Sequence, residues 1–372
     1  MFVHTGDYLE HTGNDILRST YYTFTPRPLM DGSFYTMDDS LSTLLSDAHR
    51  AFGFLEGLIY CIPDKETLAD LILLKEICFS KSIDYSDFDI RSIIEKKGKG
   101  SLDCDIQNTT SAYHYAIEKT KGNLSYNGTI TRALHGDHAK QDSAIRTKPL
   151  FLTKSSASFR QYNPTAPSKI RLALNDIDAY IRAGSADVLI KAAMCHYQFE
   201  MIHPFECYNG IVGRILPYNM LSRAEFSGVQ FLCLSASLYR HRAEYFDKLE
   251  STQKNGNYTA WIGFFIRIFI EAVQTGIEFI QYYDALARND EEKVLTRRQD
   301  RADHTLNVYN HFKRNIVSNI GYASERLHLS FPTVARAVGI LQELGILVQT
   351  SAGIRNRVFA HTGLLQRMIS PE

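Results

Sequence analysis

The sequence contains no run of about 18 apolar residues, so it offers no segment that could span a membrane by hydrophobicity alone. The first residues, Met1 to Asp7, lack a basic stretch followed by an apolar one, which argues against a secretory signal peptide. Only six cysteines occur among 372 residues, and none forms a CxxC pair. This scarcity argues against both a zinc site and a disulfide framework. We therefore expect a cytoplasmic protein that does not associate with membranes.

Net charge is also absent, because 41 Lys and Arg balance 41 Asp and Glu. The balance is uneven along the chain, since residues 293–367 hold 11 Lys or Arg against 4 Asp or Glu. This excess of +7 makes the C-terminal part the segment best suited to contacts with nucleic-acid phosphates.

Most of the chain shows the apolar periodicity of helices, beginning near Ser42. Further helices are predicted over residues 65–79, 111–121, 124–137, 168–183, 185–201, 210–224, 237–250 and 261–286. Residues 1–40 are polar and aromatic, and we expect an arm that packs on the body. Residues 147–167 combine β-formers, Ser and Pro, which favours a loop or hairpin. The charged residues 289–293 are predicted to be a linker.

After the linker, the sequence predicts a compact C-terminal unit. Two helices, near 303–317 and 322–327, precede a third that Ser330 caps, with Pro332 in its first turn and Gly345 at its end. Two short strands, 346–350 and 355–360, follow. Helices followed by a two-stranded ribbon are the plan of a winged helix, and the segment from Ser330 to Leu347 resembles that family.

The segment from His203 to Arg214 carries the clearest chemical signal. Asn209-Gly210 is a turn signal directly before an apolar run, so a helix starting there would offer free backbone N–H groups to an anion such as phosphate. Arg214, one turn further on, would reach the same anion. His203 at the rim would serve as a general base, although a single His before Pro is more often a packed or exposed residue.

This segment, HPFECYNGIVGR, resembles the active-site loop of the Fic (Fido) family, HPFx[D/E]GNGRxxR, and residues 196–202 match the family's usual lead-in. The resemblance covers roughly residues 42–290. It implies a mainly α fold, a Fic-type helical bundle with a β-hairpin flap, followed by the winged helix. The expected domains are an N-terminal arm and helical region (1–110), a Fic core (111–290) and the winged helix (291–372).

Fic proteins mostly transfer AMP from ATP to a Ser, Thr or Tyr hydroxyl of a target protein. By resemblance, His203 would deprotonate that hydroxyl, Asn209 and Gly210 would hold phosphate oxygens, and Arg214 would bind the terminal phosphate. The resemblance also implies that Gly213 contributes to phosphate binding. The flap within 147–167 would clamp the target peptide by strand addition. A homodimer is also implied by the family.

Three residues depart from the family pattern. Cys207 stands where an Asp or Glu usually holds Mg²⁺, and a thiol is a poor ligand for that ion. Tyr208 replaces a Gly that would permit positive φ or close phosphate approach. Ile211 replaces an Arg that would meet the phosphates. These changes predict ATP binding without a good Mg²⁺ site, and AMP transfer that is weak, altered or lost.

Residues 75–85 resemble the family's inhibitory helix, [S/T]xxxE[G/N], whose Glu pairs with the last Arg of the motif. Ser80 is kept, while Asp84 stands for the Glu and Tyr85 for the Gly. Asp84 is one methylene shorter than Glu. Two interpretations remain open at this point: a salt bridge to Arg214, or an ordinary solvated helix end.

The alternative function is a catalytically inactive adaptor or a DNA-binding regulator that acts through the winged helix. Arg336 on the third helix and Arg355 and Arg357 at the wing are the DNA candidates, and Lys313 and Arg314 could meet phosphates. Winged helices also dock proteins, so the sequence leaves DNA and protein partners both open.

Overall fold

The computed structural model describes residues 5–11, 21–32, 34–85, 87–118, 145–151, 163–183, 186–297, 302–353 and 356–372. These residues are mainly helical, which confirms the predicted fold class. The helices are α1 (Asp39–Tyr60), α2 (Lys65–Asp84), α3 (Ile90–Gly98), α4 (Cys104–Glu118), α6 (Pro167–Arg182), α7 (Val188–Ile202), α8 (Asn209–Arg223), α9 (Leu234–Arg240), α10 (Arg242–Asn255), α11 (Tyr258–Arg297), α12 (Ala302–Asn315), α13 (Ile320–Leu327), α14 (Phe331–Glu343) and α15 (Thr362–Ile369). The strands are β1 (Gly6–His11), β2 (Tyr21–Pro26), β3 (Val317–Asn319), β4 (Leu347–Gln349) and β5 (Val358–His361), and short 3-10 turns lie at Leu29–Asp31 (η1) and Val229–Phe231 (η3).

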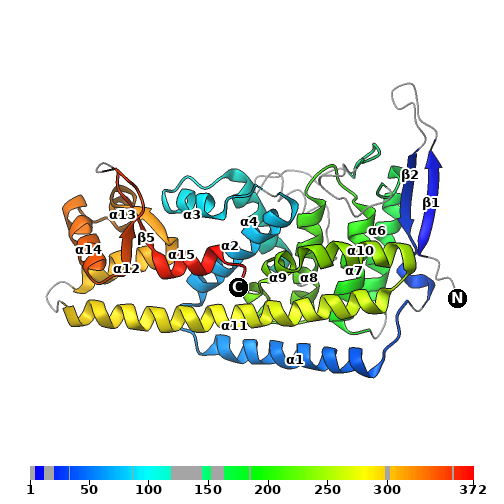
Figure 1. Ribbon diagram of the computed structural model, residues 1–372, viewed down its shortest axis with the longest axis horizontal. Helices are drawn as coiled ribbons and strands as arrows, with labels where there is room; N and C mark the ends of the chain where they lie inside the picture. The colour runs from blue at the N-terminus through cyan, green and yellow to red at the C-terminus, as the bar shows by residue number, and fades with distance from the viewer. Residues whose placement is uncertain are drawn as a thin grey trace.

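Helix α11 runs along most of the length of the molecule (Figure 1). Helix α1 packs along it, as do α7, α9 and α10. Its length and composition would suit a membrane span, but 67% of its most apolar window is buried inside the protein. Side chains such as Trp261, Phe265 and Phe269 lie in the main core. Core packing therefore accounts for the apolar character of this helix.

Four predicted boundaries are wrong, and the predicted helix 124–137 lies outside the described residues. Helix α4 begins at Cys104, well before the predicted start at residue 111. Helix α2 continues past Phe79 to Asp84, so the residues that resemble the inhibitory element are helical. The predicted helix 237–250 is two helices, α9 and α10, that meet at His241. The predicted linker 289–293 is part of α11. Asp290 explains this, because its carboxylate is buried and lies 3.0 Å from His361 Nε2. A tertiary contact thus stabilises a helix where the composition indicated a linker.

The N-terminal arm contains a hairpin that the sequence did not predict. Strands β1 and β2 pair antiparallel, with Gly6 opposite Pro26 and His11 opposite Tyr21. Phe24 and Leu29 are buried in the main core, so the arm packs on the body as expected. The other edge of β2 meets Asn163. The backbone N–H of Asn163 donates to Tyr22 O at 3.2 Å, and its carbonyl oxygen accepts from Phe24 N at 2.9 Å. Of the predicted flap, only 147–151 and 163–167 lie within the described residues.

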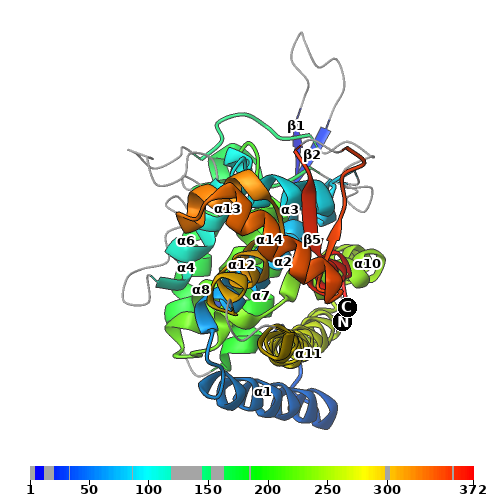
Figure 2. The ribbon, with the colours of Figure 1, turned by 90° about the vertical axis from the view of Figure 1, so that its left-hand side faces the viewer.

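The C-terminal unit lies at the end of the molecule away from the hairpin (Figures 1 and 2). It has its own small core, which includes Val308, Phe312, Val334, Leu341 and Phe359. Its strands form an antiparallel sheet in the order β3-β5-β4. The helices α12, α13 and α14 and the strands β4 and β5 follow one another in the predicted order. The sequence predicted neither β3 nor α15, because three to eight residues carry too little periodicity.

The predicted caps of α14 are confirmed. The Ser330 hydroxyl accepts a hydrogen bond from Thr333 N, Pro332 lies in the first turn, and Gly345 follows the helix with a φ of 72°. The unit is also joined to the body, because Ile316, Val317 and Ala360 belong to the main core. Helix α15 packs against α2, α3 and α11.

Candidate active site

The loop between α7 and α8 is closed by the side chain of Asn209. Its Oδ1 accepts from Phe205 N at 2.9 Å, and its Nδ2 donates to Phe205 O at 2.8 Å. Helix α8 begins at Asn209, as predicted, and the side chain is 4% exposed. The amide is therefore committed to the shape of the loop. Only the backbone N–H of Asn209 is then left to contact an anion.

His203 follows the last residue of α7 and adopts a left-handed conformation with a φ of 46°. Its Nδ1 lies 2.9 Å from the carbonyl oxygen of Glu200. A carbonyl oxygen can only accept, so Nδ1 carries the ring proton and Nε2 carries the lone pair. The ring is thus held in the tautomer that a general base acting through Nε2 requires.

Arg146 joins the flap to this loop. Its guanidinium donates to His203 O at 2.7 Å, Ile202 O at 3.2 Å and Lys148 O at 3.1 Å, and also to Thr165 O. Lys148 and Thr165 lie at the two ends of the predicted flap. Because Arg146 is 3% exposed, this clamp fixes both flap ends relative to His203.

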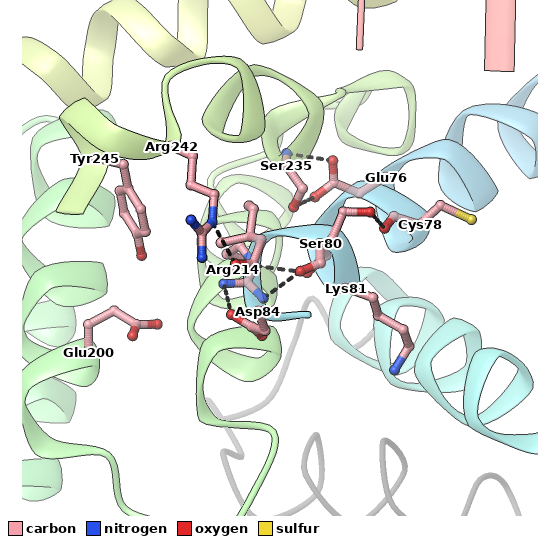
Figure 3. A network of polar contacts seen from close by, with 12 residues as sticks. Glu76, Cys78, Ser80, Lys81, Asp84, Glu200, Arg214, Ser235, Arg242 and Tyr245 are labelled. Carbon is pink, nitrogen blue, oxygen red and sulfur yellow. Dashed lines mark hydrogen bonds and ion pairs between the residues drawn. The ribbon is translucent and has the colours of Figure 1, made fainter. Parts of the chain in front are cut away.

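Arg214 is almost fully buried and meets the predicted inhibitory residues (Figure 3). Its Nε donates to Ser80 Oγ at 2.8 Å and its Nη2 to Ser80 O at 2.8 Å. Its Nη2 and Nη1 lie 2.6 Å and 3.3 Å from the two Asp84 carboxylate oxygens. Burial alone would lower the pKa of Arg214, but the Asp84 carboxylate raises it overall. Of the two interpretations of Asp84, the structure shows the salt bridge.

The Asp84 carboxylate also lies at the start of α8. A Cβ built on Gly210 would come within 2.9 Å of both Asp84 carboxylate oxygens. The Asp84 carboxylate therefore lies against both Arg214 and the N-terminus of α8, where the sequence predicted a site for an anion. A side chain at position 210 would therefore require the ends of Asp84 and Arg214 to shift.

Helix α2 is held in place by polar contacts that sequence reasoning missed (Figure 3). Arg242 Nε donates to Ile83 O at 2.9 Å, at the C-terminal end of α2. The buried Glu76 carboxylate accepts from Ser235 N at 2.7 Å and from Tyr113 Oη at 3.0 Å. Burial raises the pKa of Glu76. These partners are far apart in sequence, so no local pattern could have revealed them.

Cys207 does not fit the role of the missing metal ligand. Cys207 is exposed, but partial desolvation and the charge of Glu206 raise the pKa of its thiol, so the sulfur stays protonated at neutral pH. Mg²⁺ takes hard oxygen ligands, and a neutral thiol is not one. In the described part of the chain, no group of three His, Cys, Asp or Glu side chains could hold a metal ion. The residues present therefore do not fit a Mg²⁺ site of the family type.

Tyr208 adopts a φ of 61°, the left-handed conformation for which its family counterpart is Gly. Its hydroxyl donates to the Asp105 carboxylate on α4. Lys81 Nζ lies 2.7 Å from Asp105 and 5.0 Å from the centre of the Tyr208 ring. These contacts offset the backbone strain. The ring is therefore tied to α2 and α4 beside the anion site, an arrangement that the sequence did not predict.

Two further motif positions lie in the interior. Ile211 is 1% exposed and belongs to the main core. Gly213 lies against α7, because a Cβ there would come within 2.3 Å of Glu200 Oε1, and its carbonyl oxygen is 2.7 Å from His196 Nδ1. The structure thus places Gly213 at the contact between α7 and α8, apart from the anion site at Gly210.

The C-terminal candidates are dispersed. Arg336 is exposed on α14 and donates to Pro332 O at 3.3 Å. Arg357 lies 5.4 Å from the centre of the Phe359 ring, and Arg355 lies outside the described residues. Lys313 is 8% exposed and lies 3.4 Å from both Asp64 and Glu291. The expectation that Lys313 meets phosphates is wrong, because these carboxylates already neutralise it.

The fold is similar to that of Fic family proteins. Residues 124–221 match the sequence model of the Fic/DOC family. A Fic family protein from Desulfovibrio desulfuricans G20 shares the fold with a TM-score of 0.55 and 16% identity, over 89% of this chain and 98% of that one. A Fic domain containing signaling protein from Bacteroides thetaiotaomicron VPI-5482 has a TM-score of 0.50 and 14% identity, over 65% of this chain and 98% of that one. Residues 124–221 of this chain are therefore a Fic/DOC-family region, and the predicted family is confirmed.

Proposed function

We propose that this protein binds ATP at the start of α8 and transfers AMP slowly to a hydroxyl of a target protein, with α2 holding the site closed. The observation that carries this proposal is the Asp84 carboxylate on Arg214 and Gly210. A site that selects an internal carboxylate is suited to an external phosphate of the same charge sign.

In the proposed reaction, His203 Nε2 accepts the proton of the target hydroxyl, and the hydroxyl oxygen attacks the α-phosphorus of ATP as pyrophosphate leaves. The hydrogen bond from Nδ1 to Glu200 O keeps the ring in the required tautomer. The Arg146 clamp keeps the flap ends in register with His203. Arg214 becomes available to phosphate oxygens once Asp84 moves away.

The same site explains why transfer would be slow. Two cationic groups of the family pattern are missing here, since the thiol of Cys207 does not fit Mg²⁺ and Ile211 lies in the core. Each loss removes several kcal/mol of electrostatic stabilisation from a phosphoryl transition state. We therefore assign no step to a metal ion.

Calorimetry with ATP, with and without Mg²⁺, tests the binding half of the proposal. Incubation with ATP labelled at the α-phosphate tests transfer, with the His203→Ala variant as control. We expect binding that Mg²⁺ barely changes, and a weak label that disappears in the variant. No binding, together with no label that depends on His203, would refute the proposal.

The second candidate is a catalytically inactive regulator that acts through the C-terminal unit. It is favoured by Tyr208, whose contacts with Asp105 and Lys81 tie down the loop beside the anion site. The triple variant Cys207→Asp, Tyr208→Gly and Ile211→Arg separates the candidates, because gain of AMP transfer would show that the rest of the site is competent. A gel shift with duplex DNA, compared with an Arg336→Ala and Arg357→Ala double variant, tests the DNA-binding version.

A further inference from the structure

A groove of about 1230 Å³ lies at the hairpin end of the molecule, between β1 and α6. Its walls are residues 5–9 of β1 and the adjoining loop, residues 25–28 that end β2, and the exposed face of α6 from Lys169 to Asp176. Gln198 of α7, the helix that leads to His203, also lines it. Figure 1 shows the hairpin and α6 at the end opposite the C-terminal unit. Neither the anion site nor the C-terminal unit accounts for this groove.

Gln198 is 2% exposed and only half satisfied. Its Nε2 donates to Arg27 O at 2.7 Å, whereas its Oε1 accepts no hydrogen bond from the described residues. A buried amide oxygen without a donor is costly, and native proteins rarely leave one. This oxygen is suited to a ligand that brings an N–H group into the groove.

Three carboxylates, of Asp7, Asp31 and Asp176, line the groove together with two cationic residues, Arg27 and Lys169, and two of the carboxylates lack an ion-pair partner in the described part of the chain. Asp176 accepts from Leu29 N at 2.7 Å, and within the described residues neither Asp176 nor Asp31 forms an ion pair. Burial raises the pKa of Asp176, and the nearby charge of Asp31 raises it further. The Arg27 guanidinium lies 5.0 Å from the centre of the Phe34 ring and donates to the carbonyl oxygen of Asp31. A cation from outside would relieve the repulsion between the two carboxylates.

Two features of the groove walls suit an extended chain. Strand β1 is an edge strand of the described sheet, because it pairs only with β2. Leu172 on the opposite wall is 67% exposed, which offers an apolar contact. The other edge of β2 meets Asn163 at the end of the predicted flap, and Thr165 Oγ1 donates to Phe24 O at 3.0 Å. The groove is therefore continuous with the flap through β2.

We propose that this groove docks an extended segment of a partner protein that carries a Lys or Arg. The cationic side chain meets Asp31 and Asp176, an N–H of the segment satisfies Gln198, and an apolar side chain packs on Leu172. That this partner is also the protein that receives AMP rests on the proposed function. Docking itself does not, because binding to the groove needs neither ATP nor His203.

Fluorescence anisotropy with two labelled eight-residue peptides tests the proposal: alternating Val and Arg, and alternating Val and Glu. We expect the full chain to bind the basic peptide about tenfold more tightly than the acidic one, as a single favourable charge contact would give. Asp31→Lys should abolish this preference, because it places a cation where the ligand's cation would lie. Asp247→Lys, an exposed change on α10, is the matched control and should keep it.

Leu172→Lys provides a second test that does not depend on Asp31, with Leu295→Lys on α11 as its control. We expect the first variant alone to weaken binding of the basic peptide by about tenfold. Equal affinity for the two peptides, or equal effects of each groove variant and its control, would overturn the proposal. Sedimentation velocity that shows self-association lost only in Leu172→Lys would assign the groove to a second copy of this chain instead. Because none of these measurements uses ATP, their failure is distinct from failure of AMP transfer.

Discussion

The Asp84→Asn variant tests whether α2 closes the anion site. The substitution keeps the shape of the side chain but removes the charge that meets Arg214. Breaking a buried ion pair by removing one partner costs about 3–5 kcal/mol. The Asp84 side chain is 30% exposed, so water partly compensates for the lost ion pair with Arg214. We therefore expect the free energy of unfolding to fall by about 2–3 kcal/mol.

The same free energy sets the change in ligand affinity. In the native chain an incoming phosphate must first displace Asp84, so the open state is a minor population and the apparent affinity falls by that fraction. A cost of about 2–3 kcal/mol corresponds to about 30- to 150-fold. Asp84→Asn should therefore bind ATP more tightly than the native chain by that factor, although the variant is less stable without ligand.

Urea unfolding and calorimetry with ATP or pyrophosphate measure the two effects. At a ligand concentration of about 100 times the dissociation constant, bound ligand should restore about 2.7 kcal/mol to the variant. Asp47→Asn is the matched control, because Asp47 forms an exposed ion pair with Arg50 that is worth about 0–1 kcal/mol. If Asp84→Asn loses stability without gaining affinity, the carboxylate has a purely structural role and the reasoning about closure is wrong.

Three further predictions concern the surroundings of the site. Gly213→Ala should lower the free energy of unfolding by about 1–3 kcal/mol in urea titrations, because the added Cβ would lie 2.3 Å from Glu200 Oε1; an unchanged midpoint would contradict the close packing of α7 and α8. Arg146→Met should cost about 3 kcal/mol and abolish any label that depends on His203, since four backbone carbonyls lose their donor; retained transfer would show that the clamp is dispensable. Burial lowers the pKa of His196 from its ordinary value of 6.5 to about 4. Between pH 4 and pH 6.5 this residue therefore binds a proton in the unfolded chain but not in the folded chain. Its contribution to stability is present above pH 6.5 and is lost as the pH falls towards 4, by about 3 kcal/mol; urea titrations at pH 7, 5.5 and 4.5 should show a decline that is smaller in His196→Gln.

Local signals explain which features were predictable from the sequence. The start of α8 at Asn209, the Ser330 cap and the turn at Gly345 each depend on residues within a few positions of one another. Helix α6 was equally visible, because one apolar face is repeated over several turns, whereas α7 was visible as a run that is apolar on all sides. The motif from His203 to Arg214 indicated the family, since its residues act together in one short loop.

Errors and omissions arose where a distant residue decides the local structure. The continuation of α11 through Asp290 depends on His361, and the burial of Lys313 depends on Asp64 and Glu291. The sheet of the C-terminal unit needed β3, which no pattern within Val317–Asn319 could reveal. In each case a contact between separate elements overrides composition.

The sequence by itself determined the helical fold class, the Fic/DOC resemblance of residues 124–221, and Gly210 and Arg214 as the residues of the predicted anion site. Only the tertiary structure decided the state of that site. Ser80 and Asp84 lie more than a hundred residues from Arg214 in the chain, and the packing of α2 against α8 brings the carboxylate within 2.6 Å of the guanidinium. The shorter side chain of Asp84 still reaches its partner because the distance depends on how two helices pack, and no local sequence pattern encodes that distance.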